Sequence, residues 1–140
     1  MCAESPKATT CRPWYPSARR PAFGIALSET ILDFGEPLFS QLDAALPLDA
    51  VQSIFKIVIM VWNPHVMSMP RWGQPRFLTD LNERMHDPQI PPEMVDAMRT
   101  LSQRRLERFA NDGRAVGEWS LVTEAGEWRL RCDARVPNDH

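Results

Sequence analysis

A glutamate and a histidine stand three residues apart in the stretch Glu83–His86. On a helix this spacing places a carboxylate and an imidazole on one face, as in the di-iron helical bundles. Such a site needs two of these pairs and two further carboxylates, so residues from elsewhere would have to complete it. Single matches to this spacing are common at solvated helix ends. The metal site is therefore an alternative hypothesis, with Asp33, Glu36, His65, Glu83 and His86 as its ligands.

A second group of metal-ligating types lies in the stretch His65–Met69, which holds one imidazole and the two thioethers of Met67 and Met69. These are soft ligands suited to Cu(I). Methionine is also the usual adaptable filler of irregular cavities. We favour the filler role and expect no cofactor.

Motifs for catalysis are missing from the sequence. No serine lies in a G-x-S-x-G context and no glycine-rich phosphate loop occurs. Cys132 falls at an inward position of a predicted strand, where a thiol is usually inert. Three histidines, His65, His86 and His140, are few for an acid–base assembly. The sequence therefore favours a non-catalytic protein.

Arginine outnumbers lysine by 14 to 2, and several arginines gather on the last predicted helix and on the hairpin after it. Such a gathering is one mark of a nucleic-acid-binding face. Acidic residues alternate with these arginines, however, and the net charge is -2. We therefore favour a solvated surface of mixed charge and keep nucleic-acid binding as the weaker alternative. The arginines concerned are Arg99, Arg104, Arg105, Arg108, Arg129, Arg131 and Arg135.

Trp72 lies in a predicted loop beside Met67, Met69 and Arg71 and has no evident place in a core. Exposed Trp, Met and Arg are enriched at protein interfaces. The loop either packs back on the core or binds a partner, and the sequence leaves both open. The predicted partner-binding residues are Met67, Met69, Arg71, Trp72, Arg104, Arg108 and Arg131.

Cysteine use and the apolar pattern predict the compartment. Cys2, Cys11 and Cys132 leave one thiol unpaired in any disulfide scheme, which favours a reducing environment. The first residues lack the apolar run of a signal peptide, and no stretch reaches the roughly 20 apolar residues of a membrane-spanning helix. We expect a cytoplasmic protein that does not enter a membrane.

Helical periodicity and proline punctuation predict four helices. Residues 28–45 form the first, with a break at 35–37 where Pro37 removes a backbone donor. Residues 50–63 form a central helix, apolar around most of its circumference, that Pro64 ends by excluding Asn63 from helical geometry. The third and fourth helices cover residues 75–85 and 92–111.

The last segment changes to a period of two, which predicts a β-hairpin. A turn at Ala125-Gly126 pairs Trp119 with Cys132, Leu121 with Leu130 and Thr123 with Trp128 on one apolar face. The other face pairs Glu118 with Asp133 and Ser120 with Arg131. The predicted fold is α+β, a four-helix cluster with a C-terminal antiparallel β-hairpin over residues 25–140. Residues 1–24, rich in proline, are predicted to be a flexible N-terminal arm.

Three segments carry a resemblance to known proteins: Ile31–Leu38 (ILDFGEPL), Val61–Asn63 (VWN) and Phe109–Asp112 (FAND). The chain resembles a family of small uncharacterised bacterial proteins with LDFaePLl, aWN and F..D.R segments. The resemblance covers most of the chain after residue 27 and implies no activity. The leading hypothesis is therefore a cytoplasmic interaction or accessory protein that binds a protein partner or itself.

Overall fold

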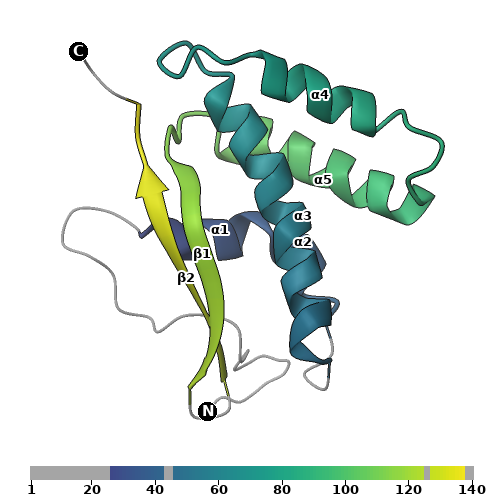
Figure 1. The fold of residues 1–140 in the computed structure, drawn as a ribbon, viewed down its shortest axis with the longest axis vertical. Coiled ribbons are helices and arrows are strands. Elements are labelled where there is room, and N and C mark those ends of the chain that lie inside the picture. Colours follow the sequence, from purple (N-terminus) through teal and green to yellow (C-terminus); the bar gives the residue numbers. More distant parts are fainter. Residues whose placement is uncertain (1–25, 43–45, 125–126, 138–140) are drawn as a thin grey trace.

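Figure 1 shows the computed structural model, which describes residues 26–42, 46–124 and 127–137. Within these ranges five helices precede a two-stranded antiparallel hairpin, which confirms the α+β class. The predicted arm at 1–24 and the predicted turn at 125–126 lie outside the described residues. The elements are α1 (Leu27–Phe34), α2 (Glu36–Phe39), α3 (Leu48–Met67), α4 (Arg76–Arg84), α5 (Pro92–Arg108), β1 (Ala115–Glu124) and β2 (Glu127–Arg135).

Gly35 separates α1 from α2, at the predicted break. The reason lies in packing as well as in Pro37. A Cβ on Gly35 would lie 2.6 Å from Cε2 of Phe39 and 3.0 Å from Cγ2 of Val58. Only a residue without a side chain lets the chain turn this close to the core. The predicted first helix is thus two short helices, and α2 ends at Phe39 rather than at 45.

The prediction that Pro64 ends the central helix is wrong, because α3 continues to Met67 with Pro64 inside it. The residues around the proline explain why. Trp62, His65 and Val66 are buried, and the side chain of Asn63 is hydrogen-bonded to β1. Tertiary contacts on both sides of Pro64 outweigh the loss of one backbone hydrogen bond.

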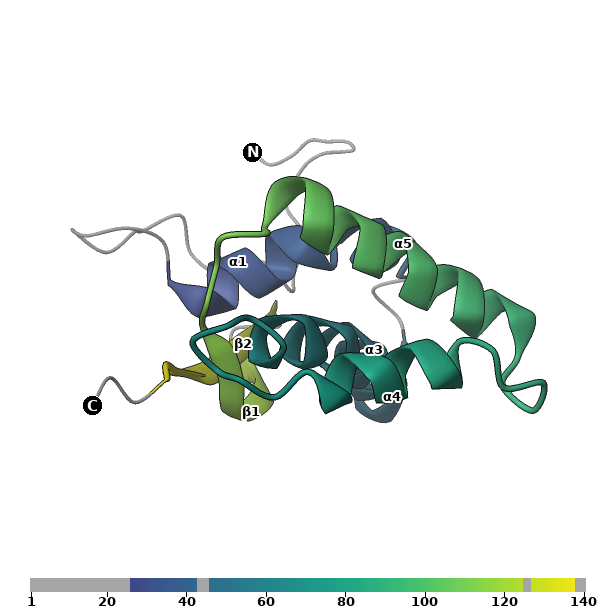
Figure 2. The same cartoon turned by 90° about the horizontal axis from the view of Figure 1, so that it is seen from above.

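Helix α3 is the central element of the fold. In Figure 1 the hairpin stands on one side of α3, with α4 and α5 on the other, and α3 contacts α4, α5 and β1. Figure 2 shows α5 and α1 above α3 and α4. Helix α1 contacts β2 and so closes the core at the hairpin end. Among the described residues, no helix combines the length and apolarity needed to cross a membrane.

The register of the hairpin is as predicted over its distal part. Trp119 pairs with Cys132, Leu121 with Leu130 and Thr123 with Trp128. Nearer the helices the register shifts between Val116 and Trp119, so the predicted one-to-one pair of Glu118 with Asp133 is not formed. There Gly117 and Glu118 oppose a single residue, a β-bulge that increases local twist. Ala134 and Val136, which continue the two-residue alternation of apolar positions past Cys132, are both exposed.

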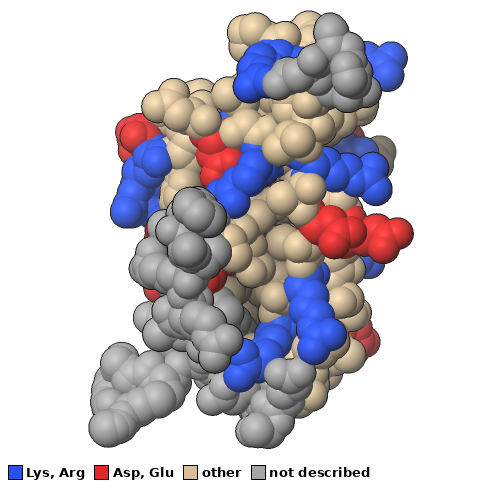
Figure 3. Space-filling view, turned by 90° about the vertical axis from the view of Figure 1, so that its left-hand side faces the viewer, with Lys and Arg blue, Asp and Glu red and all other residues tan. Residues whose placement is uncertain are grey.

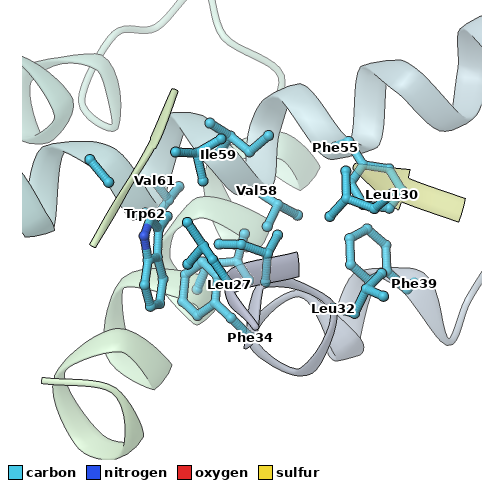
Figure 4. Packing of buried hydrophobic residues seen from close by; sticks show 14 of the residues in the cluster. Leu27, Leu32, Phe34, Phe39, Phe55, Val58, Ile59, Val61, Trp62 and Leu130 are labelled. Carbon is cyan, nitrogen blue, oxygen red and sulfur yellow. The ribbon is translucent and has the colours of Figure 1, made fainter. Parts of the chain in front are cut away.

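Aromatic rings from α1, α2, α3 and the segment after α5 pack together in the core, part of which appears in Figure 4. Phe34, Trp62 and Phe109 form a triangle of edge-to-face contacts, with centroids 5.0 to 5.9 Å apart. Phe39 stacks on Phe55 at 4.4 Å. Edge-to-face and offset stacking each add to the stabilisation from buried area. The triangle fixes the start of the segment that follows α5.

Candidate functional site

Residues 109–114, between α5 and β1, form neither helix nor strand, yet side chains donate hydrogen bonds to the carbonyls of Phe109, Asp112, Gly113 and Arg114. The indole of Trp62 donates to the carbonyl of Arg114 at 2.8 Å, and the indole of Trp72 donates to that of Gly113 at 2.9 Å. Buried backbone groups without a ladder need such partners. We call residues 109–114 the α5–β1 connection. Two tryptophans from α3 and from the following loop hold it in place.

Arg105 also holds the α5–β1 connection in place. It is only 2% exposed, which corrects the prediction that it adds to a surface charge. Its guanidinium donates to the carbonyls of Phe109 and Asp112 and to the sulfur of Met69. It also lies 4.6 Å from the centroid of the Trp62 ring, a cation–π contact. Met69 therefore has a structural partner inside the protein.

The carboxylate of Asp112 supplies a negative charge next to two arginines, Arg105 and Arg114. The carboxylate accepts from Nε and Nη2 of Arg114 at 3.0 and 2.7 Å, a bidentate pair. Burial alone would raise the pKa of Asp112, but the hydrogen bonds and charge of Arg114, with the charge of Arg105, hold that pKa below its usual value. Arg114 also donates to the hydroxyl of Thr30 on α1. The pair ties the connection to the first helix.

Beside this buried network the surface is hollowed. A cavity of about 380 Å³ is lined by Met69, Arg71, Trp72, Gly113, Arg114, Val136 and Pro137. A second hollow, lined by Arg71, Trp72, Gln74, Arg135, Val136 and Pro137, adjoins it through four shared residues. We call the two together the loop–strand groove, because one wall is the loop after α3 and the other is the end of β2. Val136 is 67% exposed there.

No protein-family model, curated protein sequence or solved structure matches this chain.

The seven predicted partner-binding residues divide among several places. Met69, Arg71 and Trp72 line the loop–strand groove. Met67 is half-buried against the core, and Arg104 binds the carbonyls of Asp33 and Phe34 at the end of α1. Arg108 and Arg131 are exposed on α5 and on β2. Arg135 and Val136 also line the groove but are not among the seven predicted residues. A strand pattern alone cannot place them beside a loop about 60 residues away in the sequence.

The five predicted metal ligands are not gathered into one site. Asp33 and Glu36 lie on α1 and α2, His65 is buried on α3, and Glu83 and His86 are exposed at the end of α4. The His86 ring is hydrogen-bonded to the carbonyl of Asn82. In the part of the chain that the structure describes, no group of three or more His, Cys, Asp and Glu side chains could hold a metal ion.

A serine and a histidine meet in the interior, a pairing that the sequence pattern did not indicate. Nε2 of His65 lies 3.1 Å from Oγ of Ser102. Burial, and then the charge of Arg105, lower the pKa of His65 to about 4. A general base works best with a pKa near the operating pH, and neither residue lines the groove. The pair joins α3 to α5.

Cys132 lies on the inner face of the hairpin, as predicted. Burial, together with the charge of Asp133, raises the pKa of its thiol to about 11 against the opposing charge of Arg114. Because the thiolate is the nucleophilic form, this raised pKa leaves Cys132 mostly protonated and weakly nucleophilic at neutral pH.

Proposed function

We propose that this protein is a non-catalytic interaction protein that binds a protein partner in the loop–strand groove. The observation that carries the proposal is the composition of the groove. Half-buried Met69 and Trp72 line it together with the exposed Val136, and Arg71 and Arg135 also line it. Trp, Met and Arg are the types enriched at interface hot spots, and an apolar centre with a polar rim is the usual anatomy of an interface.

The rigidity of the groove supports this proposal. The Trp72 indole is fixed to Gly113, and Met69 is fixed to Arg105. A surface held in one geometry loses little side-chain entropy on binding, which favours affinity. Arg105 and Asp112 thus act indirectly, by positioning the wall of the groove. We propose the cytoplasm as the compartment, on the composition of the chain.

Site-specific photo-cross-linking in cells tests the proposal. Benzoylphenylalanine replaces Val136 in one variant and Leu106 in the control, since Leu106 is an equally exposed apolar residue on α5, 65% exposed, that does not line the groove. We expect one cross-linked product at position 136 that is absent at 106 and is lost when Trp72→Ala is added. Purified components must then bind directly. Equal products at both positions, or none at 136, contradict the proposal.

A second copy of this chain is the other partner that the proposal allows. Light scattering after size exclusion reports the mass of the wild type and of the Val136→Asp variant, with Leu106→Asp as the control. A dimer that only Val136→Asp dissociates identifies the partner as a second copy of the chain. If all three proteins are monomers, the partner is a different protein, and the cross-linking must show it.

A further inference from the structure

The two edges of the hairpin differ in their cover. The edge of β1 that faces away from β2 is hydrogen-bonded at Val116 to the side chain of Asn63 on α3. Within the described residues, β2 pairs with β1 alone, and no backbone hydrogen bond from another segment reaches it. An open strand edge is a template for a further strand. We infer that β2 pairs with β2 of a second copy of this chain, so that the two hairpins form one four-stranded antiparallel sheet.

This pairing goes beyond the proposed function, because it uses the backbone edge of β2 and not the loop–strand groove. A two-stranded sheet is marginal in water, and two further strands stabilise it. Two-fold symmetry restricts the geometry, since the same strand from each copy runs antiparallel to the other about one central position. Each side chain keeps its face of the sheet only when odd-numbered positions face odd-numbered ones.

Charge favours one of the registers that remain. The charged residues of β2 stand at alternate positions, and those after the first are Arg129, Arg131, Asp133 and Arg135. When Arg131 is the central residue, Arg129 of each copy faces Asp133 of the other. Position 127, a glutamate in the sequence, then faces Arg135. Both of these opposite-charge pairs occur twice by symmetry, whereas like charges meet once, where Arg131 faces its own counterpart.

Neighbouring registers bring more like charges together. With the centre one position earlier in the strand, Arg129 faces Arg131 of the other copy. With the centre one position later, the attraction between Arg131 and Asp133 is offset by the repulsion between Arg129 and Arg135. Arg131 is also the middle one of the nine residues of β2, so a pairing about it joins the whole strand. Charge and strand length therefore favour the same register.

The apolar positions of β2 fit this register as well. Ala134 is exposed although it continues the apolar alternation of the strand. About Arg131 as the centre, Ala134 faces the half-buried Trp128 of the second copy, and Leu130 faces Cys132. Contacts between facing apolar side chains stabilise a strand pair. The second copy thus covers an apolar residue that the single chain leaves in water.

The charged side chains are able to form the cross-strand pairs. Asp133 is exposed, and none of the described residues forms an ion pair with its carboxylate. Arg129 is half-buried and has a partner in its own chain, but a guanidinium carries five N–H donors and can bind a second acceptor. Figure 3 shows the side of the molecule on which β2 lies in Figure 1, where basic and acidic side chains are interspersed. A surface of both signs suits contact with a copy of itself.

Light scattering after size exclusion, at a series of concentrations of the full chain, tests the inference. We expect a wild-type dimer whose dissociation constant rises by about tenfold or more in Asp133→Arg, because two attractive contacts become repulsive. Adding Arg129→Asp to that variant restores opposite charges and should return the dissociation constant to near the wild-type value. Asp80→Arg makes the same charge change at an exposed position of α4 and should leave the dimer unchanged.

A disulfide tests the register, in chains that carry serine in place of Cys2 and Cys11. Arg131→Cys should form a disulfide-linked dimer on mild oxidation, because the Cα atoms of facing residues lie about 4.5–5.5 Å apart in an antiparallel pair. Asp133→Cys should form much less, because position 133 faces position 129 and not itself. Urea denaturation midpoints show that all variants fold.

Four outcomes overturn the inference: a monomeric wild type, a dimer that Asp133→Arg does not weaken, a folded double variant that stays monomeric, and equal cross-linking of the two cysteine variants. None of them touches the proposed function, which the cross-link at position 136 tests separately. A dimer that Val136→Asp dissociates and Asp133→Arg does not would belong to the loop–strand groove and contradict pairing through β2.

Discussion

Asn63 of α3 is hydrogen-bonded to both backbone groups of Val116, the second residue of β1. The Val116 amide donates to Oδ1 at 2.8 Å, and Nδ2 donates to the Val116 carbonyl at 2.9 Å. The side-chain amide thus takes the place of a neighbouring strand at this point of the β1 edge. An exposed strand edge needs such cover, because its free backbone groups otherwise pair with other chains.

Replacing Asn63 by Ala should lower the free energy of unfolding by about 2 kcal/mol, because Val116 is buried and both of its backbone groups would lose their partner. Urea denaturation followed by far-ultraviolet circular dichroism measures the loss. Asn82→Ala is the matched control: Asn82 is an exposed asparagine on α4, and only its backbone is in the bond to His86. A loss no larger than that of Asn82→Ala would show that water replaces the Asn63 amide.

Arg105→Met should be more destabilising, by roughly 3 kcal/mol, because it keeps an apolar stem but leaves the carbonyl of Asp112 without its side-chain donor and that of Phe109 with only the Asp112 amide. It also removes the cation–π contact with Trp62. Arg108→Met makes the same change at an exposed position on the same helix and should be nearly neutral. The fluorescence of the tryptophans should shift in the first variant only. Equal unfolding midpoints for the two variants would contradict the structural role of Arg105.

Local patterns predicted the hairpin well, because the two-residue alternation allows only one register that joins the apolar sets. The role of Arg105 could also have been read from the sequence. It extends the buried stripe of Met98 and Leu101 by one helical turn, yet its charge suggested solvent. An isolated glycine inside a strand pattern suggests a bulge, so Gly117 was a local signal for the register shift. The groove itself joins segments about 60 residues apart in sequence, so only the tertiary fold brings it together.

Unlike the substitutions of Asn63 and Arg105, Pro64→Ala should stabilise the protein. Alanine restores the backbone donor that proline lacks inside α3, and proline in a helix interior costs about 3 kcal/mol relative to alanine. Part of this gain is offset because proline also restricts the unfolded chain, so we expect a net gain of about 1–2 kcal/mol in urea denaturation. A destabilised variant would mean that packing of the half-buried ring outweighs the missing hydrogen bond.

His65 should make stability depend on pH in the mildly acidic range. Its pKa in the folded protein is lowered to about 4 from an ordinary value of 6.5, first by burial and then by the charge of Arg105. Between these values the unfolded chain binds a proton that the folded protein does not, so lowering the pH favours unfolding. The stability is complete above pH 6.5, falls as the pH drops toward 4, and the total loss is about 3 kcal/mol.

Urea denaturation at closely spaced pH values from 7.5 to 5.5 measures the upper part of this dependence, above the range in which carboxylates ordinarily titrate. In His65→Gln the slope over this range should nearly vanish, because glutamine can keep a hydrogen bond to Ser102 but does not titrate. His86→Gln changes an exposed histidine just after the end of α4 and should retain the full slope. If His86→Gln abolished the slope and His65→Gln kept it, the titrating group would lie outside the core. Loss of the slope in His65→Gln alone shows that His65 stays neutral beside a buried arginine.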